Sequence, residues 1–351
     1  MMYDVLILGM PETACAAAWI AARRCLRVGI VDCPTVADPC ALEWVTDIPG
    51  RLDELSLAFV DVNSRTAGSP PRMLDVARIW SELSEGVTQR RANRVADLSC
   101  QGVDCLSGSV RFANSHQVLV EDRGISTALT ADRIVIATGI RSDRPGHLPF
   151  DGRRLLTMED VPNLNQIPQN VAVVVDDPSG LESVRLFCLL GSRVTVVGEA
   201  VEEISSGAIQ RLEHHLGSAG ATPPMWCRSS AVLSVEYDEG ARVALILSDG
   251  SRIEQDAAVY CGRVTGNTDT LNLSSAGLES DDRGQLWCNE QFQTWVPHIY
   301  GLGEVIGYPS AAASLPDGPS AFIDALLAGG PACATRGVGA IPSESLLACG
   351  V

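Results

Sequence analysis

The first 32 residues constrain the fold most, because they combine two apolar runs, a glycine turn, an alanine-rich segment and a final acid. Residues 3–8 are typical of a buried parallel strand, and residues 14–23 are strong helix formers. A second apolar run, residues 28–31, is followed by Asp32, about 20 residues beyond the turn, as in dinucleotide-binding units. The pattern predicts a βαβ unit and therefore an α/β fold.

The turn between strand and helix reads Gly9-Met10-Pro11-Glu12-Thr13-Ala14, where a dinucleotide-binding unit would have G-x-G-x-x-G. The middle glycine normally lets pyrophosphate approach the backbone, and the helix N-terminus supplies N–H donors and positive potential. Pro11 removes a donor, and the Glu12 carboxylate repels phosphate. Two alternatives follow: Glu12 accepts the free N–H groups and no anion binds, or a distorted site still binds one.

The same unit recurs about 165 residues further along the chain, which indicates an internal duplication. Residues 171–175 predict a strand, 180–190 a helix and 193–197 a second strand, followed by Glu199. Its turn, Asp176-Asp177-Pro178-Ser179-Gly180, carries two acids and a proline where a pyrophosphate would bind. An Asp-Pro turn with Ser179 as helix cap explains this segment without a ligand, and we favour that interpretation over intact NAD binding.

The remaining segments predict further elements of both units. In the first half we expect a loop with a short helix at 33–60, a helix at 74–83, antiparallel strands within 105–120 and at 126–129, and a parallel strand at 134–139. In the second half we expect a helix at 206–217 and strands near 231–237, 242–248 and 257–261. The proline-rich stretch 145–168 places a domain boundary near residue 150.

Charge and cysteine usage exclude several classes of function. Lys and Arg number 26 against 43 Asp and Glu, a formal charge of -17, which argues against binding nucleic acid or anionic lipid. No apolar run is long enough to cross a membrane and the N-terminus does not resemble a signal peptide, so we expect a soluble, cytoplasmic protein. The twelve cysteines form no C-x-x-C pair, and adjacent His214 and His215 point apart on a helix, so we expect reduced core thiols and no metal site.

Several longer segments carry a family likeness. They are Tyr3-Asp4-Val5 and residues 137–141, 262–269, 282–286, 293–294 and 297–310. Together they resemble the pyridine nucleotide-disulfide oxidoreductases, flavoproteins with two dinucleotide-binding domains, and within them the soluble pyridine nucleotide transhydrogenases. The resemblance implies two Rossmann-like domains of three-layer β/β/α character, one holding FAD and one holding NAD(H) or NADP(H), with hydride passing between the two cofactors.

The resemblance also implies a division of the chain and a set of binding residues. The FAD-binding type of domain would comprise residues 1–150 and 262–330, the NAD(P)-binding type residues 151–261, and a Gly/Ala/Pro-rich tail residues 331–351. The residues it assigns to the first cofactor are Gly9, Pro11, Ala14, Asp32, Thr138, Gly139, Gly303 and Glu304, with Asp32 at the adenosine ribose and Glu304, an aspartate in the family, at the ribitol. The residues assigned to the second are Gly180 and Glu199.

The sequence departs from the family at three further places. Cys40 is a candidate reactive thiolate without the second cysteine that disulfide reduction needs, and a buried inert thiol is the alternative. Pro316, Gly318 and Pro319 are expected to end or bend the helix that faces the flavin in the family. The family's interface domain, of about 100 residues, has no counterpart in the sequence. We therefore expect a flavin-dependent pyridine nucleotide oxidoreductase homologue with impaired or lost activity, or alternatively a cofactor-free pseudoenzyme that acts as a binding or regulatory protein.

Overall fold

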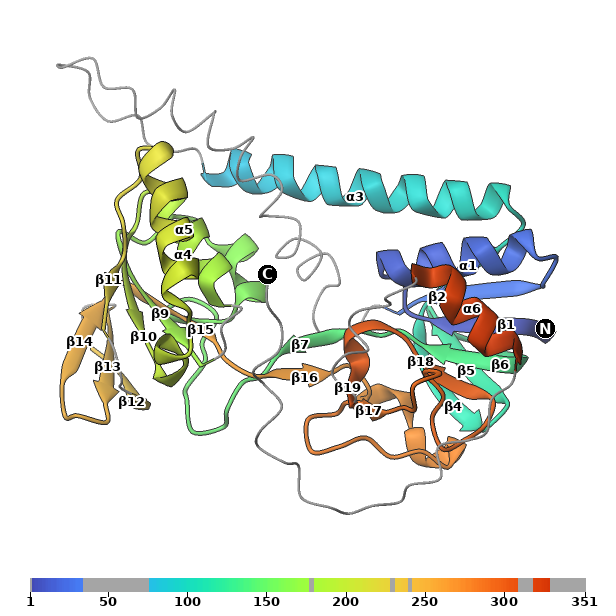
Figure 1. The fold of residues 1–351 in the computed structure, drawn as a ribbon. Coiled ribbons are helices and arrows are strands. Elements are labelled where there is room, and N and C mark those ends of the chain that lie inside the picture. Colours follow the sequence, from blue (N-terminus) through green and yellow to red (C-terminus); the bar gives the residue numbers. More distant parts are fainter. Residues whose placement is uncertain are drawn as a thin grey trace.

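A computed structural model describes residues 2–33, 76–176, 180–227, 231–238, 242–308 and 318–328. Within the helix that begins at residue 76, the side chains are described from residue 85 onward. Cys40, the segment Asp177–Ser179, Pro316 and the tail at 331–351 lie outside the described residues, as does the loop expected at 33–60. The described chain builds two units, each centred on its own sheet, which we call the first and the second unit (Figure 1).

The first unit is built on a seven-stranded sheet. Its strands are β1 (Met2–Leu8), β2 (Val28–Asp32), β3 (Asp104–Ser107), β4 (Ser109–Asn114), β5 (Gln117–Asp122), β6 (Ile125–Ile136) and β18 (Ile299–Gly301). The order is β3-β2-β1-β6-β5-β4, with β18 also paired to β6. The second half of β6 pairs in parallel with β1 and β18, whereas its first half pairs antiparallel with β5. The two separate strands expected at 126–129 and 134–139 are therefore one continuous strand that ends before Ala137.

The parallel part of this sheet, formed by β3, β2, β1, β18 and the second half of β6, is the middle layer of three. Val5 and Ile7 of β1 pack into a core with α1 (Glu12–Arg23) and α6 (Gly318–Ala328), while Leu6 and Leu8 pack into a core with the β4-β5 hairpin. Alternate residues of a strand point to opposite faces, so an uninterrupted apolar run is what a strand buried on both faces requires. The expected β/β/α layering is thus confirmed.

The second unit repeats this architecture. Five parallel strands run in the order β11-β10-β9-β15-β8, with bounds β8 (Leu155–Leu156), β9 (Asn170–Val175), β10 (Arg193–Val197), β11 (Met225–Trp226) and β15 (Ala257–Cys261). Helices α4 (Leu181–Leu189) and α5 (Ser206–Ser218) share the core on one face, and a sheet of β12 (Val232–Tyr237), β13 (Val243–Leu247) and β14 (Arg252–Gln255) shares the core on the other. Strand β14 had not been expected, because its half-exposed polar sequence gives a weak apolar signal.

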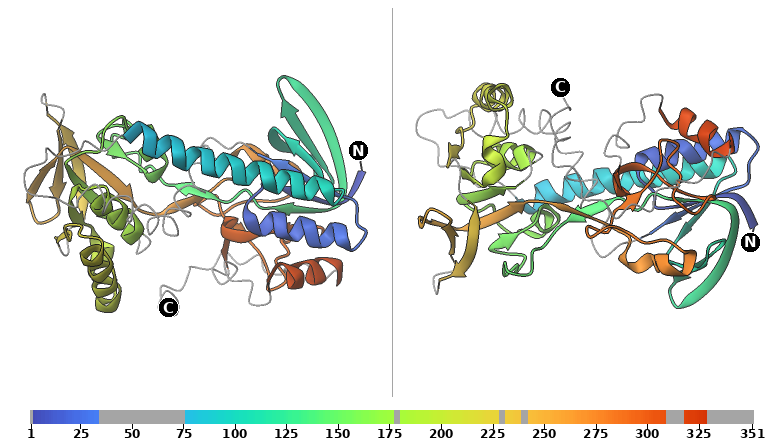
Figure 2. Two further views of the ribbon diagram at one scale, coloured as in Figure 1. Left: turned by 90° about the horizontal axis from the view of Figure 1, so that it is seen from above. Right: turned by 60° about the horizontal axis from the view of Figure 1, so that its bottom comes forward.

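Two connections join the units. Strands β7 (Ile140–Ser142) and β16 (Val264–Gly266) pair antiparallel where the chain leaves and re-enters the first unit. The long helix α3 (Val76–Cys100) lies across both units in Figures 1 and 2, with Val87 in the helix-side core of the second unit and Leu98 in that of the first. The helix expected at 74–83 therefore extends to Cys100. Its apolar residues are widely spaced because each end packs on a different unit, which hides the helical period in the sequence.

The C-terminal described helix begins where the sequence suggested a break. Helix α6 starts at Gly318, whose φ is +72°, and Pro319 follows in the first turn, where a missing N–H costs nothing. Arg133 of β6 donates a hydrogen bond of 2.9 Å to the Leu326 carbonyl and so ties α6 to the sheet. Gly318 and Pro319 thus start a helix, while the stretch before them lies outside the described residues.

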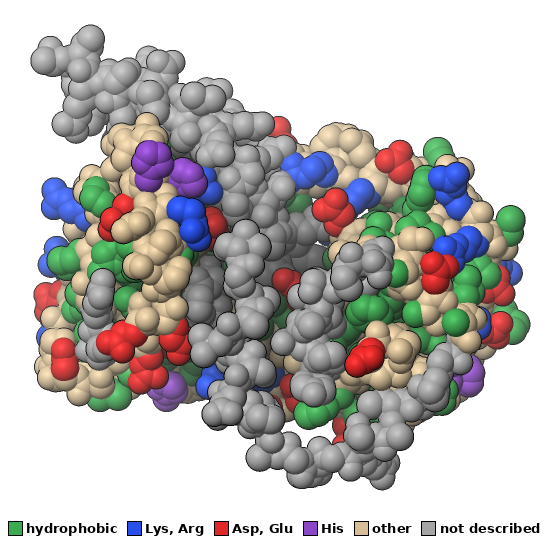
Figure 3. Space-filling model, in the orientation of Figure 1, with side chains coloured by type: hydrophobic (Ala, Val, Ile, Leu, Met, Phe, Trp, Pro, Cys, Tyr) green, Lys and Arg blue, Asp and Glu red, His purple; other side chains and the backbone are tan. Residues whose placement is uncertain are grey.

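The remaining short elements connect these layers. They are β17 (Leu286–Trp287), β19 (Ile306–Tyr308) and the 3-10 helices η1 (Met158–Asn163), η3 (Glu199–Glu202), η4 (Asp269–Leu271), η5 (Leu273–Ala276) and η6 (Gly303–Val305). Among the described helices, none combines the length and apolar character that crossing a membrane requires. Acidic and basic side chains are interspersed over the coloured surface in Figure 3.

Candidate functional site

The turn after β1 is pressed against the end of β6. Gly9 has a φ of +107°, and a Cβ atom there would lie 2.6 Å from the Ala137 carbonyl carbon and closer still to its oxygen. Its N–H donates a 2.8 Å hydrogen bond to the Val31 carbonyl, which fixes the turn at the end of β2 as well. Only glycine fits both requirements, so Gly9 keeps the close approach of backbones that a dinucleotide site needs.

Pro11 and Glu12 form the start of α1. Pro11 is the N-cap residue in an extended conformation, with φ −66°, and its side chain makes no capping hydrogen bond. Glu12 is the first helical residue and is exposed, while Ala14 is fully buried against the sheet. Pro11 thus offers neither an N–H nor a capping side chain, and the Glu12 carboxylate lies in the first turn of the helix. Self-capping by Glu12 stays a prediction.

Thr138 and Gly139 follow β6 directly and are held by Asn267. The Asn267 side-chain amide donates to the Thr138 carbonyl, and its backbone N–H donates to the Gly139 carbonyl, both at 3.0 Å. Arg141 in turn donates to the Asn267 side-chain oxygen at 3.1 Å and to Asp269 at 2.7 Å. The buried Oγ1 atom of Thr138 has no hydrogen-bond partner among the described residues. A buried hydroxyl of this kind is paired in most proteins, so it marks a position where a ligand atom can bind.

Asp32 lies at the end of β2, as expected, and forms an ion pair with Arg91 of α3. The Asp32 side chain is 18 % exposed and that of Arg91 21 %, so the pair is largely removed from water. The acid that the resemblance assigns to the adenosine ribose is thus neutralised by a basic residue from another element.

Gly303 and Glu304 approach the first turn from a third segment. Gly303 has a φ of +79°, and a Cβ there would lie 3.7 Å from Oγ1 of Thr13 in α1. Glu304 follows in η6 and its carbonyl accepts a 3.2 Å hydrogen bond from Gln285. Although the residue is exposed, surrounding protein atoms remove its carboxyl partly from water, and this burial raises the pKa of Glu304.

The corresponding turn of the second unit is also closely packed. Gly180 is the N-cap residue of α4, and a Cβ there would lie 3.0 Å from Cβ of Cys261 and 3.1 Å from the Val175 side chain. Gly198 precedes Glu199 with φ +134°, and a Cβ there would lie 2.7 Å from the Val175 carbonyl carbon. Both glycines are thus required for packing around the end of β9, and Glu199 is exposed at the start of η3.

Asp176, at the end of β9, interacts with a side chain of its own unit. Its carboxylate lies beside Tyr260, and its N–H donates a 3.0 Å hydrogen bond to the Cys261 carbonyl. Burial raises the pKa of Tyr260, and the negative charge of Asp176 raises it further. The described part of the second turn is therefore stabilised by protein groups without a nucleotide.

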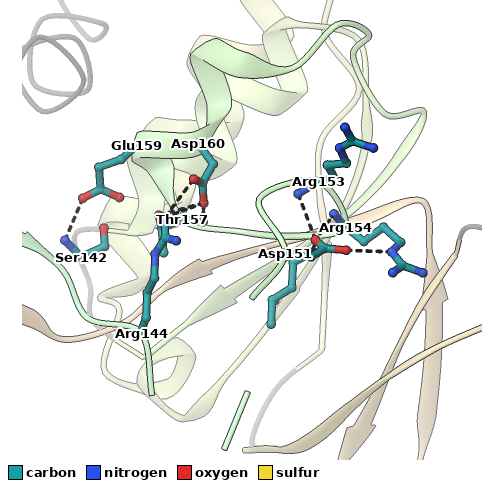
Figure 4. A network of polar contacts seen from close by, with 9 residues as sticks. Ser142, Arg144, Asp151, Arg153, Arg154, Thr157, Glu159 and Asp160 are labelled. Atoms are coloured by element: carbon teal, nitrogen blue, oxygen red, sulfur yellow. Dashed lines mark hydrogen bonds and ion pairs between the residues drawn. The ribbon is translucent and has the colours of Figure 1, made fainter. Parts of the chain in front are cut away.

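A polar network lies where the chain passes from the first unit to the second (Figure 4). The Ser142 N–H donates 2.7 Å to Glu159, and Arg144 donates to both Asp160 oxygens at 2.8 and 2.9 Å. Asp151 accepts from the backbone of the following loop and from the Arg154 guanidinium. The charge-assisted bonds hold β7 against η1 and fix the linker where the boundary near residue 150 was expected.

The structure brings the predicted residues of the first cofactor together and separates them from those of the second. Gly9 lies against Ala137 and Thr138, and Gly303 lies near Thr13 at the start of α1, whereas Gly180 and Glu199 belong to the second unit. No disulfide joins the described cysteines, and no cluster of metal-ligating side chains occurs within the described ranges. Cys40 lies outside those ranges, so its role stays a prediction.

Sequence reasoning missed Arg91, Asn267, Gly198 and Tyr260. Asn267 lies in the segment 262–269 that carries the family likeness, and Gly198 directly precedes the predicted acid, so both had a usable signal. Arg91 is one of several arginines in a polar helix and gives no signal of its own.

Comparisons with known proteins agree with this geometry. The sequence profile described as pyridine nucleotide-disulphide oxidoreductase matches residues 3–318. The soluble pyridine nucleotide transhydrogenase of Mycobacterium tuberculosis is 31 % identical over 323 residues, which cover 89 % of this chain and 68 % of the relative. The corresponding protein of Marinomonas is 29 % identical, covering 90 % and 68 %.

Solved structures share the fold. The Cu(II) complex of the HOCl-induced flavoprotein disulfide reductase RclA from Escherichia coli superposes with a TM-score of 0.72 at 18 % identity, covering 93 % of this chain and 71 % of that one. LpdA from Mycobacterium tuberculosis superposes with a TM-score of 0.74 at 21 % identity, covering 93 % and 73 %.

Proposed function

The chain belongs to the pyridine nucleotide-disulphide oxidoreductase family, and from this membership we propose that it is a flavin-dependent pyridine nucleotide oxidoreductase of the soluble-transhydrogenase type with impaired hydride exchange. In this proposal the first unit binds FAD and the second unit binds NAD(H) or NADP(H) weakly or not at all. The chemistry that a bound FAD supplies is acceptance and return of a hydride.

The observation that carries the proposal is the fit of the first turn to a pyrophosphate. Gly9 keeps the backbone of the turn against Ala137, the N-cap residue Pro11 makes no side-chain capping bond to α1, and the hydroxyl of Thr138 is buried without a partner among the described residues. Free N–H groups at a helix N-terminus and an unpaired hydroxyl are the donors that such a ligand uses. Gly303 would let a ligand pass close to Thr13, and Glu304 would accept bonds from ligand hydroxyls.

Impairment is proposed from the charges around both turns. In the first unit, Pro11 offers no N–H and the exposed Glu12 carboxylate weakens anion binding at the helix N-terminus. In the second unit, Asp176 places a carboxylate beside Tyr260, where a dinucleotide turn would present free N–H groups. The second site therefore fits a nucleotide less well than the first.

A cofactor-free binding or regulatory protein is the second candidate. It is favoured by one specific observation, which is that the acids of both units lie beside protein groups: Asp32 pairs with Arg91, and Asp176 lies beside Tyr260. A chain that has lost its nucleotides would be stabilised by such internal pairs.

Visible absorption of the purified protein, before and after incubation with FAD, separates the two candidates. We expect the wild type to be purified with less than one flavin per chain. In calorimetry, the double variant P11G/E12A should bind FAD about tenfold more tightly than the wild type, because one N–H donor returns and one negative charge is removed. The exposed Glu121 of β5 provides the control variant E121A, which removes a charge elsewhere. If neither the wild type nor P11G/E12A binds FAD, the flavin proposal is wrong and the cofactor-free alternative stands. Parallel titrations with NADH and NADPH measure the second site independently.

A further inference from the structure

Helix α3 holds a cation at the adenosine end of the first nucleotide site. Val87 packs in the core of the second unit and Leu98 in that of the first, so the helix is fixed on both sides of Arg91. From this position the Arg91 guanidinium contacts Oδ2 of Asp32 at the end of β2. Resting on the proposed function, we propose that Arg91 is a positioning residue of the first site, which orients Asp32 toward the adenosine ribose and offsets the negative charge around the pyrophosphate.

The charge of the site supports this role. Glu12, Asp32 and Glu304 bring three carboxyl groups to a region that would receive a doubly charged pyrophosphate. Arg91 contacts one of them directly, and both partners are about four-fifths covered by protein, so their attraction is screened less than that of an exposed pair. Without the guanidinium, Asp32 would be a largely buried, uncompensated charge next to an anionic ligand.

The stereochemistry leaves room for the ligand. An ionised carboxylate has about four acceptor positions on its two oxygens. Arg91 engages Oδ2, so Oδ1 of Asp32 can accept the ribose 2′-hydroxyl, which is the bond that the acid of a dinucleotide fingerprint makes. The ion pair restricts the side-chain torsions of Asp32, and the entropy of ordering that acid is therefore lost on folding rather than on binding.

Calorimetric titration of the apoprotein with FAD and with ADP tests the inference without measuring turnover. We expect R91Q to bind both about tenfold more weakly, because a charge-assisted contact and its compensation are lost, and R91K to lie between R91Q and wild type. R94Q, on the same helix, is the matched control and should stay within about twofold of wild type. The double variant D32N/R91Q should bind more tightly than R91Q, since the amide oxygen of asparagine still accepts a hydroxyl without leaving a charge.

Each outcome has a distinct consequence. Weaker binding by R91Q with recovery in D32N/R91Q supports the inference. A preference for ADP over 2′-deoxy-ADP that disappears in D32A supports the contact between Asp32 and the ribose 2′-hydroxyl. Binding by R91Q as tight as, or tighter than, wild type would show that Arg91 competes with the ribose or is a bystander. Equal losses in R91Q and R94Q would assign the effect to the helix instead. Absence of FAD and ADP binding in the wild type would overturn the proposed function itself. If R91Q does not fold, R91K is the variant that tests the role of the guanidinium.

Discussion

The substitution Gly9→Ala tests how the first turn is packed. The new Cβ would lie 2.6 Å from the Ala137 carbonyl carbon and 3.0 Å from the Thr138 nitrogen, both of them backbone atoms at the end of β6. A φ of +107° adds a cost of about 1–2 kcal/mol for any residue with a Cβ, and overpacking adds about 1–3 kcal/mol. The unfolded chain has less conformational entropy with alanine than with glycine, and this reduces the combined cost by about 0.5 kcal/mol. We therefore expect a loss of about 2–4 kcal/mol in the free energy of unfolding.

Urea unfolding followed by circular dichroism measures this loss, and Gly102→Ala is the matched control. Gly102 has a φ of +81° but nothing within 4 Å of its Cβ position, so only the conformational cost and its entropic offset apply, and a loss of about 0.5–1.5 kcal/mol is expected. The difference between the two variants isolates the contact with β6. The same clash exists at Gly198 in the second unit, where the Val175 carbonyl carbon is 2.7 Å away, so Gly198→Ala should resemble Gly9→Ala.

A Gly9→Ala variant no less stable than Gly102→Ala would refute this reasoning. It would mean that the turn can move away from β6 at little cost. The close approach of backbones on which the proposed pyrophosphate site rests would then not be a fixed feature of the fold.

Two further predictions concern titratable groups. The rings of His298 and His116 are stacked, with their centroids 3.7 Å apart. Burial and the neighbouring His116 lower the pKa of His298 below 6.5. Because the folded state resists protonation of His298, the free energy of unfolding should fall as the pH drops below about 6.5. Urea unfolding at pH 7.5 and 5 should show a smaller difference for H298Q than for wild type or for H214Q, and an unchanged difference would contradict the assignment. Burial raises the pKa of Cys33 and Cys188 to about 12, whereas Cys25 and Cys100 are exposed. Iodoacetamide at pH 8 followed by mass spectrometry should therefore modify Cys25 and Cys100 in the folded protein and the other two only in urea, and rapid labelling of Cys33 would show that it is accessible.

Most regular elements were predictable because their signals are local. The strand runs at 3–8, 28–31, 171–175 and 193–197 are predominantly apolar, as expected for strands covered on both faces, and the helices between them are rich in helix formers. The errors have local causes too. Helix α3 was expected to end near residue 83 because its buried residues serve two cores, and β6 was divided because its two halves pair in opposite directions.

The candidate site was predictable only in part. Gly9 and Asp32 follow from spacing, because the turn and the end of the next strand of a βαβ unit lie at the same edge of the sheet. The expectation that Glu12 caps its own helix stays a prediction, since the structure shows Pro11 at the N-cap without a capping hydrogen bond and Glu12 as the first helical residue. Spacing gives no information on whether a polar side chain finds a partner.

The sequence by itself predicted two duplicated βαβ units, since short-range periodicity and turn residues specify elements of this kind, and its resemblance to a known family implied their three-layer class. The tertiary structure decided which charges meet. Arg91 reaches Asp32 only because α3 lies across both units, and Tyr260 reaches Asp176 only because β15 pairs with β9. Such contacts join residues distant in the chain, and their electrostatic energy depends on separation and burial, which are properties of the packed molecule rather than of any segment.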